Sequence, residues 1–323
     1  MAKKIKHIGI FTSGGDAPGM NAALYAAVKT ATANGIEVSG IRKGFEGLID
    51  NDLISLTTNQ LQKTMHLGGT VLKTARSDRF RTIEGRKVAL QNIHKSGIDG
   101  LVAIGGDGTF RGVSLLADIS DIPCIGIPGT IDNDTVGTDY TLGFDSAVNT
   151  AMACIDNIRD TAESHNRMFV VEVMGRDSGY IGVYSGLTSG ADSILIPESP
   201  QDLEYLLDKI KGYNSEDAFI VVLSEGNKLG LNYVSSKIRQ VNDEIDLRFC
   251  KLGHIQRGGN PSASDRMLGI RLGVMAVNAL IQGERNKMAG ICDNQLVLTP
   301  FSKIAKQHSI DRELRSLVEL FCH

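Results

Sequence analysis

Short apolar runs alternate along the chain with amphipathic stretches. Seven apolar runs have the length of buried strands, at 7–11, 37–41, 101–104, 124–127, 169–173, 194–196 and 219–223. Helical spacing of apolar positions marks five stretches between them, at 20–34, 85–95, 144–163, 202–210 and 233–241. Because such alternation is typical of parallel sheets flanked by helices, the sequence predicts an α/β protein.

The length of the chain predicts more than one domain. With 323 residues it exceeds the usual size of a single domain, and two doubly wound domains of about 150 residues each fit better. No low-complexity tract or Pro/Ser-rich linker marks a boundary between them.

Composition limits the classes of partner and the location. Hydrophobic residues make up 42% and charged residues 22%, and the net charge is −3, so neither a nucleic acid nor a membrane is an expected partner. No apolar run reaches the length of a membrane span, and the basic N-terminus is not followed by a secretory apolar region. The five cysteines form no C-x-x-C pair, which favours reduced thiols and a cytoplasmic protein.

Two glycine-rich segments follow predicted strands. Residues 12–21 lead from the first strand into a helix, where bare backbone N–H groups and the helix dipole favour an anion. They match neither the dinucleotide-binding fingerprint nor the P-loop. In the second segment, 105–109, the carboxylate of Asp107 among glycines suggests Mg²⁺ held together with substrate phosphates. A plain structural turn is the alternative for each segment.

The segment 128–135 places two carboxylates and a hydroxyl directly after the apolar run 124–127. Thr130, Asp132 and Asp134 stand two residues apart, an arrangement that suits proton abstraction. Ligands of open α/β sheets bind at the carboxyl ends of strands, where this segment is expected. Pro, Gly, Asn and Asp also favour turns, so a turn without chemistry is the alternative.

Cations recur in other glycine-rich segments. Arg76 follows a Gly-Gly turn, Arg176 lies in MGRDSG, and His254 and Arg257 lie in GHIQRGG. Guanidinium groups in such loops match the geometry of phosphate oxygens. A solvated ion pair is the alternative for any one of them, but three such loops in one chain favour phosphate binding.

Five segments in this order resemble the ATP-dependent 6-phosphofructokinases of the bacterial type: TSGGDAPGMNAA, GGDGT, PGTIDND, MGRDSG and GHIQRGG. The resemblance covers nearly the whole chain. PGTIDND and GHIQRGG are specific to that family, whereas GGDGT also occurs in kinases of NAD and of diacylglycerol. The resemblance implies Mg²⁺-dependent transfer of the ATP γ-phosphate to the 1-hydroxyl of fructose 6-phosphate, a step of glycolysis.

The resemblance also implies roles for individual residues. Asp132 would be the base that accepts the hydroxyl proton, with Thr130 and Asp134 in support, while Arg176 and the backbone N–H of Gly15 would stabilise the transferred group. ATP would be bound by Gly15, Arg76, Arg81, Gly106, Asp107, Gly108 and Thr109, with Asp107 holding the metal. The sugar phosphate would be bound by Thr130, Asp132, Asp134, Arg167, Met174, Gly175, Arg176, Glu225, Arg248, His254 and Arg257.

Assembly and domain roles are implied in the same way. In the family, residues like Arg167 and Arg248 reach in from a neighbouring subunit, so the resemblance implies a homotetramer with shared active sites. It further implies a larger ATP-binding domain, 1–141 with 258–305, and a smaller sugar-binding domain, 142–257 with 306–323. Both boundaries are approximate.

Two glycines bear on the choice of phosphoryl donor. Pyrophosphate-dependent relatives carry Asp and Lys where this chain has Gly108 and Gly129. Without side chains at these positions, the resemblance implies space for the α-phosphate and the adenosine of ATP.

The sequence departs from the family pattern in two places, and the first concerns regulation. Tyr25, Lys29, Arg159 and Asp192 fall at the effector site of the regulated bacterial enzymes, but Thr58 stands where a cation is usual. Fewer cations predict weakened or altered allosteric control. A second departure replaces the usual aromatic-Cys pair after Arg176 by Asp177 and Ser178, and the sequence offers no physical account of it.

Three other functions explain the sequence less well. An NAD-dependent dehydrogenase requires a glycine fingerprint that the first βα unit lacks. A kinase of NAD or of a related sugar would fit GGDGT but not GHIQRGG. A non-catalytic paralogue predicts loss of the base or the metal ligand, whereas Asp132 and Asp107 are both present.

Overall fold

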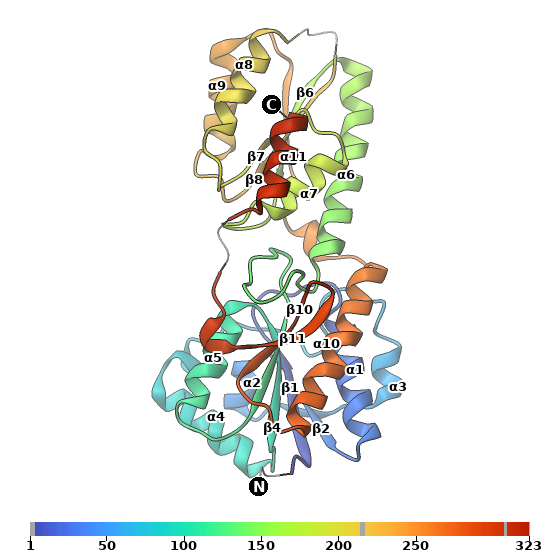
Figure 1. Ribbon diagram of the computed structural model, residues 1–323, viewed down its shortest axis with the longest axis vertical. Helices are drawn as coiled ribbons and strands as arrows, with labels where there is room; N and C mark the ends of the chain where they lie inside the picture. The colour runs from blue at the N-terminus through green and yellow to red at the C-terminus, as the bar shows by residue number, and fades with distance from the viewer. Residues whose placement is uncertain (1–3, 214–216, 307–308, 323) are drawn as a thin grey trace. The chain divides into compact units, whose positions relative to one another are not determined.

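The structure is a computed structural model that describes residues 4–213, 217–306 and 309–322. The chain divides into two compact units (Figure 1). The described part of the first unit is 4–131, Thr135–Asp145 and Arg257–Lys306; that of the second is Asp132–Asp134, 146–213, 217–256 and 309–322. Each unit therefore contains segments that are distant in the sequence.

The first unit is built on a seven-stranded sheet with the order β11-β10-β5-β4-β1-β2-β3. The five central strands run parallel, and the edge strands β3 and β11 are antiparallel to their neighbours. The bounds are β1 His7–Thr12, β2 Glu37–Ile41, β3 Leu53–Ser55, β4 Gly100–Gly105, β5 Cys124–Pro128, β10 Lys287–Cys292 and β11 Gln295–Pro300.

Helices cover both faces of this sheet (Figure 1). On one face, α1 (Met20–Ala33) packs along α10 (Ala263–Ile281), with α3 (Thr58–Gln62) beside α1. The other face is covered by α2 (Phe45–Asp50), α4 (Ile83–Lys95) and α5 (Asp107–Ala117). Two short 3-10 turns, Arg79–Arg81 and Phe301–Lys303, complete this unit.

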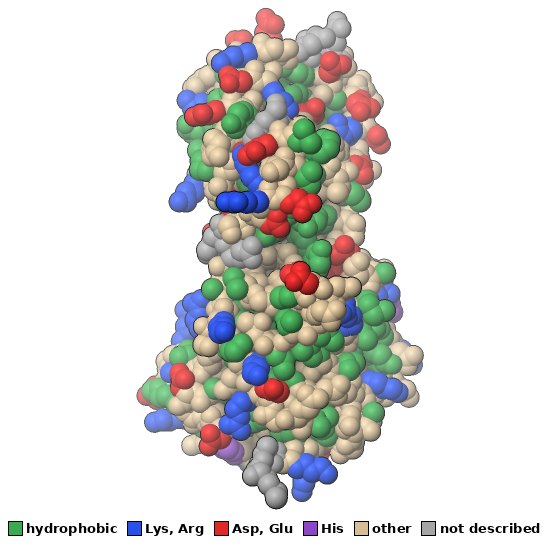
Figure 2. All heavy atoms as spheres, in the orientation of Figure 1, with side chains coloured by type: hydrophobic (Ala, Val, Ile, Leu, Met, Phe, Trp, Pro, Cys, Tyr) green, Lys and Arg blue, Asp and Glu red, His purple; other side chains and the backbone are tan. Residues whose placement is uncertain are grey.

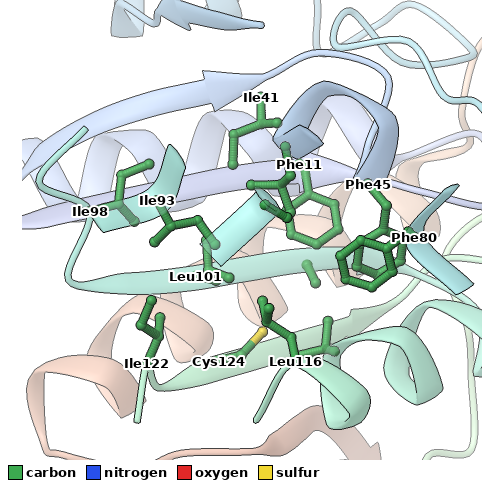
Figure 3. Close-up of a cluster of buried hydrophobic side chains, with 14 of the residues drawn as sticks. Phe11, Ile41, Phe45, Phe80, Ile93, Ile98, Leu101, Leu116, Ile122 and Cys124 are labelled. Carbon is green, nitrogen blue, oxygen red and sulfur yellow. The ribbon is translucent and has the colours of Figure 1, made fainter. Parts of the chain in front are cut away.

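A line of aromatic rings joins the sheet to this second helical face. Phe11 of β1 lies 5.1 Å from Phe45 of α2, whose ring stacks on Phe80 at 4.1 Å between centroids (Figure 3). All three are buried in a cluster that continues through Leu101 and Cys124 of the neighbouring strands. The cluster fixes the helices against β1 and β4, whose carboxyl ends carry the candidate site.

The second unit has a four-stranded parallel sheet with the order β7-β8-β6-β9. Its strands are β6 Met168–Val173, β7 Ser193–Leu195, β8 Phe219–Ser224 and β9 Leu247–Lys251. Its helices are α6 Phe144–His165, α7 Tyr180–Thr188, α8 Asp202–Lys211, α9 Gly230–Val241 and α11 Arg312–Cys322, with a 3-10 turn at Gly253–Arg257. Neighbouring pairs are α8 with α9 and α7 with α11 (Figure 1).

The α/β class predicted from the sequence is confirmed, with mainly parallel sheets flanked by helices. Every predicted strand and helix is present within a few residues of its expected bounds. Four strands were not predicted, β3, β9, β10 and β11, and all lie at or near a sheet edge. In β9, whose sequence is LRFCK, only the first residue is buried, so this edge strand has no continuous apolar run.

Charged side chains of both signs are interspersed over the face drawn in Figure 2. None of the helices formed by the described residues combines the length and the apolar character that crossing a membrane requires. All five cysteines are free thiols, as the sequence predicted, and burial raises the pKa of Cys322 to about 11.

Replacing Phe45 by Ala should lower the free energy of unfolding by about 3–4 kcal/mol, because it leaves a cavity between Phe11 and Phe80. Chemical denaturation with a far-UV circular dichroism readout measures this loss. The control is Phe321→Ala, whose side chain is 67% exposed and whose removal should cost less than about 0.5 kcal/mol. Equal losses in the two variants would contradict the importance of the aromatic line.

Candidate functional site: two sets of loops at strand ends

Parallel pairing brings three loops of the first unit to one edge of its sheet. Thr12 at the end of β1 is in register with Ile104, and Gly105 at the end of β4 is in register with Pro128 of β5. The glycine-rich segments and the 128–134 segment therefore begin side by side, as the sequence predicted. Ligands of open α/β sheets bind at this edge.

The loop after β1 is held by its neighbours rather than by its own hydrogen bonds. The Ser13 N–H donates to the Ile104 carbonyl at 2.9 Å, and the Thr74 hydroxyl donates to the Gly14 carbonyl at 2.7 Å. Arg257 lies directly over Gly15, where a Cβ would overlap its guanidinium group. Gly15 thus leaves room for the approach of Arg257, which belongs to the same unit as this loop.

The sequence predicts a loop at 105–109. The structure differs, because α5 already begins at Asp107. Gly106 precedes the helix in an extended conformation, so Asp107, Gly108 and Thr109 form its first turn. N–H groups of a first turn have no partner within the helix, and the helix dipole adds positive potential there. This arrangement favours an anion more strongly than a turn would.

Thr109 carries a buried hydroxyl with no hydrogen-bond partner among the residues that the structure describes. It lies next to Gly14, since a Cβ on that glycine would be 3.6 Å from the Thr109 Oγ1. A buried polar atom without a partner is costly unless a ligand or water completes it. Thr109 is therefore a candidate ligand donor, and its role at ATP stays a prediction.

The two glycines singled out for the phosphoryl donor differ in their surroundings. Gly108 is exposed, and a Cβ there would meet none of the described atoms within 4 Å. A Cβ on Gly129 would lie 2.7 Å from the Met20 Cε, inside packed structure. The expectation of open space at Gly129 is therefore wrong, because Met20 of α1 fills it.

Asp107 has the surroundings expected of a single-carboxylate magnesium ligand. Its carboxylate lies in the first turn of α5 and accepts a 3.1 Å hydrogen bond from Arg111, whose side chain is largely exposed. No group of three or more His, Cys, Asp or Glu side chains within 4–213, 217–306 and 309–322 could hold a metal ion alone. Mg²⁺ bound by one carboxylate and substrate phosphates fits this donor set.

The segment after β5 is well buried. Asp132 and Asp134 are 4% and 5% exposed, and the Thr141 hydroxyl donates to the Thr130 carbonyl at 2.6 Å. Thr130 also lies close to Gly106, where a Cβ would be 3.8 Å from the Thr130 Cβ. Thr130 groups with the first unit and Asp132–Asp134 with the second.

The arginines expected at ATP are exposed. The guanidinium group of Arg76 has no ion-pair partner in the described part of the chain, and the loop that carries it is tied to β1 through Thr74. Arg81 forms a loose 3.5 Å pair with Asp78, and both side chains are at least 80% exposed. Both arginines are therefore available to an anion.

In the second unit, the predicted sugar residues also follow the carboxyl ends of strands. Met174 follows β6, Glu225 follows β8, and His254 follows β9. Two contacts hold these ends together: the Glu225 N–H donates to the Val173 carbonyl at 2.9 Å, and the buried Gln256 accepts from the Met174 N–H at 3.3 Å. The sequence analysis did not assign Gln256, although its place in GHIQRGG was a signal.

Arg176 is held in a strained backbone conformation. Its φ is 52°, a value that non-glycine residues rarely adopt, and its N–H donates to the Glu225 carboxylate at 3.0 Å. Gly226 packs so closely on the Arg176 carbonyl that a Cβ would overlap it. Ser178, unexplained from the sequence, is buried: its N–H donates to the Gly175 carbonyl at 2.9 Å, and its hydroxyl accepts from the Tyr180 N–H at 3.4 Å.

Arg167 and Arg248 lie at the other end of the same strands. Arg167 precedes β6 and Arg248 is the second residue of β9. Both bind Asp246, at 2.7 Å and 2.9 Å, and the hydrogen bond from Arg167 is the main cause that lowers the pKa of Asp246. Within one subunit these two arginines are thus separated from Met174, Glu225 and His254 by the length of the sheet.

The residues expected at an effector site are divided between the units. Tyr25 and Lys29 lie on α1, and Thr58 begins α3. Arg159 donates to the carbonyls of Ser189 and Gly190 after α7, at 2.9 Å and 2.6 Å. Asp192 accepts from the Ile220 N–H at 2.8 Å, so both residues have structural partners within the second unit. Reduced effector binding stays a prediction.

A cavity of about 230 Å³ lies at the opposite edge of the first sheet. Its lining includes Ile5, Ile98 and Pro123, which precede β1, β4 and β5. It is therefore at the amino ends of these strands and is separate from the candidate site.

Known proteins share this sequence and fold. A family model described as Phosphofructokinase matches residues 7–280. ATP-dependent 6-phosphofructokinase of Cytophaga hutchinsonii is 47% identical over 319 residues, covering 98% of this chain and 97% of its own. ATP-dependent 6-phosphofructokinase 1 of Thermus thermophilus is 46% identical over 320 residues, covering 98% and 99%.

Solved structures of phosphofructokinases share the fold of this chain. The phosphofructokinase of Saccharomyces cerevisiae has a TM-score of 0.85 at 34% identity, over 92% of this chain and 45% of that one. A pyrophosphate-dependent phosphofructokinase of Marinobacter aquaeolei has a TM-score of 0.86 at 22% identity, over 98% and 92%, which shows a shared fold.

Replacing Thr109 by Val should weaken ADP binding about tenfold, because the lost hydroxyl is a donor reserved for a ligand. The free energy of unfolding should change by less than about 0.5 kcal/mol, since the hydroxyl makes no internal hydrogen bond. Titration calorimetry and denaturation measure the two effects. Unchanged ADP affinity together with a marked loss of stability would show instead that the hydroxyl is structural.

Proposed function

The chain belongs to the phosphofructokinase family, and on that premise we propose that it transfers the γ-phosphate of ATP to the 1-hydroxyl of fructose 6-phosphate. The products are fructose 1,6-bisphosphate and ADP, in a step of glycolysis. The observation that supports this best is the side-by-side start of three loops, after β1, β4 and β5, that hold phosphate donors and carboxylates.

The first unit supplies the groups that suit a nucleotide triphosphate. The N-terminus of α5, the Thr109 hydroxyl and the loop at Gly14 and Gly15 present hydrogen-bond donors, and Arg76 adds a positive charge that has no ion-pair partner among the described residues. Open space at Gly108 is compatible with the larger donor, ATP. Phosphoryl transfer depends mainly on such positioning and on neutralisation of charge.

We propose that Asp107 holds Mg²⁺ together with the β- and γ-phosphates. The ion, when bound, neutralises charge on the phosphate oxygens and orients the γ-phosphate. Arg111 is four residues away on an exposed helix face, so its ion pair with Asp107 can open without desolvation cost.

Asp132 is proposed as the base for the sugar hydroxyl. A carboxylate that is 4% exposed is shielded from water, so its interaction with a hydroxyl proton is strong. Thr130 and Asp134 each stand two residues from Asp132 in the sequence, and both are proposed to orient the hydroxyl. Arg176 is proposed to stabilise charge on the group in transfer, since its guanidinium group has no partner among the described residues.

The positions of the residues predicted to bind the sugar phosphate support a shared site in a homotetramer. Arg167 and Met174 flank the six residues of β6, so their Cα atoms lie about 23 Å apart. One phosphate group cannot contact both ends of this strand. Arg167 and Arg248 are therefore proposed to bind the 6-phosphate of a sugar held by His254, Met174 and Glu225 of a neighbouring subunit.

Regulation and location follow from the same residues. We propose weak control by charged effectors, because Arg159 already binds two carbonyl groups and Thr58 adds no charge. Five free thiols support a location in the reducing cytoplasm.

The direct test follows formation of fructose 1,6-bisphosphate by the pure protein with Mg²⁺, fructose 6-phosphate and either ATP or pyrophosphate, and also ADP release when ATP is the donor. Activity should be lost without Mg²⁺. It should be at least about tenfold lower with pyrophosphate as the phosphoryl donor, because the open space at Gly108 suits the longer nucleotide. Asp132→Ser should lower kcat about a thousandfold by removing the base. The proposal fails if the native protein releases no ADP or if the variant retains full activity.

Shared sites predict complementation between two inactive variants. Arg248→Ala lacks a phosphate ligand but leaves Asp246 paired with Arg167, and Asp132→Asn lacks the base. Subunits co-expressed and mixed at random should regain about a quarter of native activity, because a quarter of the sites then draw both intact groups from different subunits. Each variant alone is the control. A mixture no more active than its components would place all site residues within one subunit.

A further inference from the structure

We infer that Lys43 and Lys73 bind the nucleotide at its α-phosphate, and this inference rests on the proposed function. Neither residue lies in a segment that the sequence analysis singled out.

Both lysines adopt a backbone conformation that lysine rarely takes. The φ angles of Lys43 and Lys73 are 58° and 59°. Nine non-glycine residues in the described chain have positive φ, and six of these are Asn or Asp, which tolerate it. The three others are Lys43, Lys73 and Arg176, all long cations. Strain of this kind concentrates at functional positions, and Arg176 already has a proposed role at phosphate.

Both lysines lie against the phosphate loop that follows β1. The Lys73 carbonyl accepts from the Thr12 hydroxyl at 2.9 Å, and the next residue, Thr74, binds the Gly14 carbonyl. Lys43 directly precedes Gly44, where a Cβ would be 2.8 Å from the Thr12 carbonyl. The segments that carry the two lysines also contact each other, because the Lys43 N–H donates to the carbonyl of Leu72, the residue before Lys73, at 2.9 Å.

The charges of the two lysines are not used inside the protein. Both side chains are exposed, and neither ammonium group has a hydrogen-bond or ion-pair partner in the described part of the chain. Neighbouring arginines differ, because Arg42 binds Asp52 at 2.5 Å and Arg79 binds Glu46 and Asp50. Two unpaired, flexible ammonium groups beside an anion loop suit the diffuse charge of a phosphate.

Strand order assigns them to the nucleotide end of the ligand. Along the sheet edge the order is β5, β4, β1 and β2, with Asp107 after β4, Gly15 after β1 and Lys43 after β2. Adjacent strands are about 4.8 Å apart, so the end of β2 is about 10 Å from that of β4. If Asp107 acts at the β- and γ-phosphates, groups at β2 lie beyond them, at the α-phosphate. The lysines therefore distinguish a nucleotide from pyrophosphate.

The test compares ADP and pyrophosphate binding by calorimetry in native protein, Lys43→Met, Lys73→Met and the double variant. Each single variant should weaken ADP binding about fivefold and the double variant about twentyfold, with KM for ATP rising in parallel. Pyrophosphate affinity, kcat and KM for fructose 6-phosphate should stay within about twofold. Lys87→Met, which removes an exposed lysine of α4, is the matched control and should change none of these values.

Glycine variants separate charge from backbone conformation. Lys43→Gly and Lys73→Gly relieve the positive φ, so they should raise or maintain thermal stability and still weaken ADP binding as the Met variants do. Native ADP affinity in the Gly variants would overturn the inference, as would equal loss of ADP and pyrophosphate binding in the Met variants. If native protein itself binds neither ADP nor ATP, the proposed function fails as well, which distinguishes the two failures.

Discussion

The parallel hydrogen bonding of β1, β4 and β5 determines where the chemistry of the first unit is located. Because these strands share one direction and are in register, the segments that leave them start within one or two strand spacings of one another. The aromatic line from Phe11 to Phe80 then holds one helical face against these strands. Every phosphate contact proposed for the first unit depends on this arrangement.

Close backbone approach is the second constraint, and it has the same form in both units. Gly15 lies under the guanidinium group of Arg257, and Gly226 lies under the carbonyl of Arg176. A methyl group would displace the guanidinium group itself at Gly15 and the backbone that carries Arg176 at Gly226. The glycines are therefore positioning residues, and the positive φ of Arg176 is stabilised by its contact with Glu225.

The distribution of sugar residues connects the fold to assembly. A parallel strand carries binding groups at its carboxyl end, yet Arg167 and Arg248 stand at the amino ends, where Asp246 holds both. This pairing keeps two cations close together in a single subunit. In the proposed shared site, a second copy of the chain would supply the complementary carboxyl end.

The sequence by itself determined the α/β class, the central strands and the phosphate loops, because buried parallel strands are continuous apolar runs and glycine-rich turns stand directly after them. It did not determine edge strands such as β9, whose exposed residues break the apolar run. Only the tertiary structure decided that Asp107 begins a helix, that Met20 fills the space at Gly129 and that Arg257 lies on Gly15. These features depend on side chains from segments far apart in the chain, and local residue patterns do not determine which distant segments come into contact.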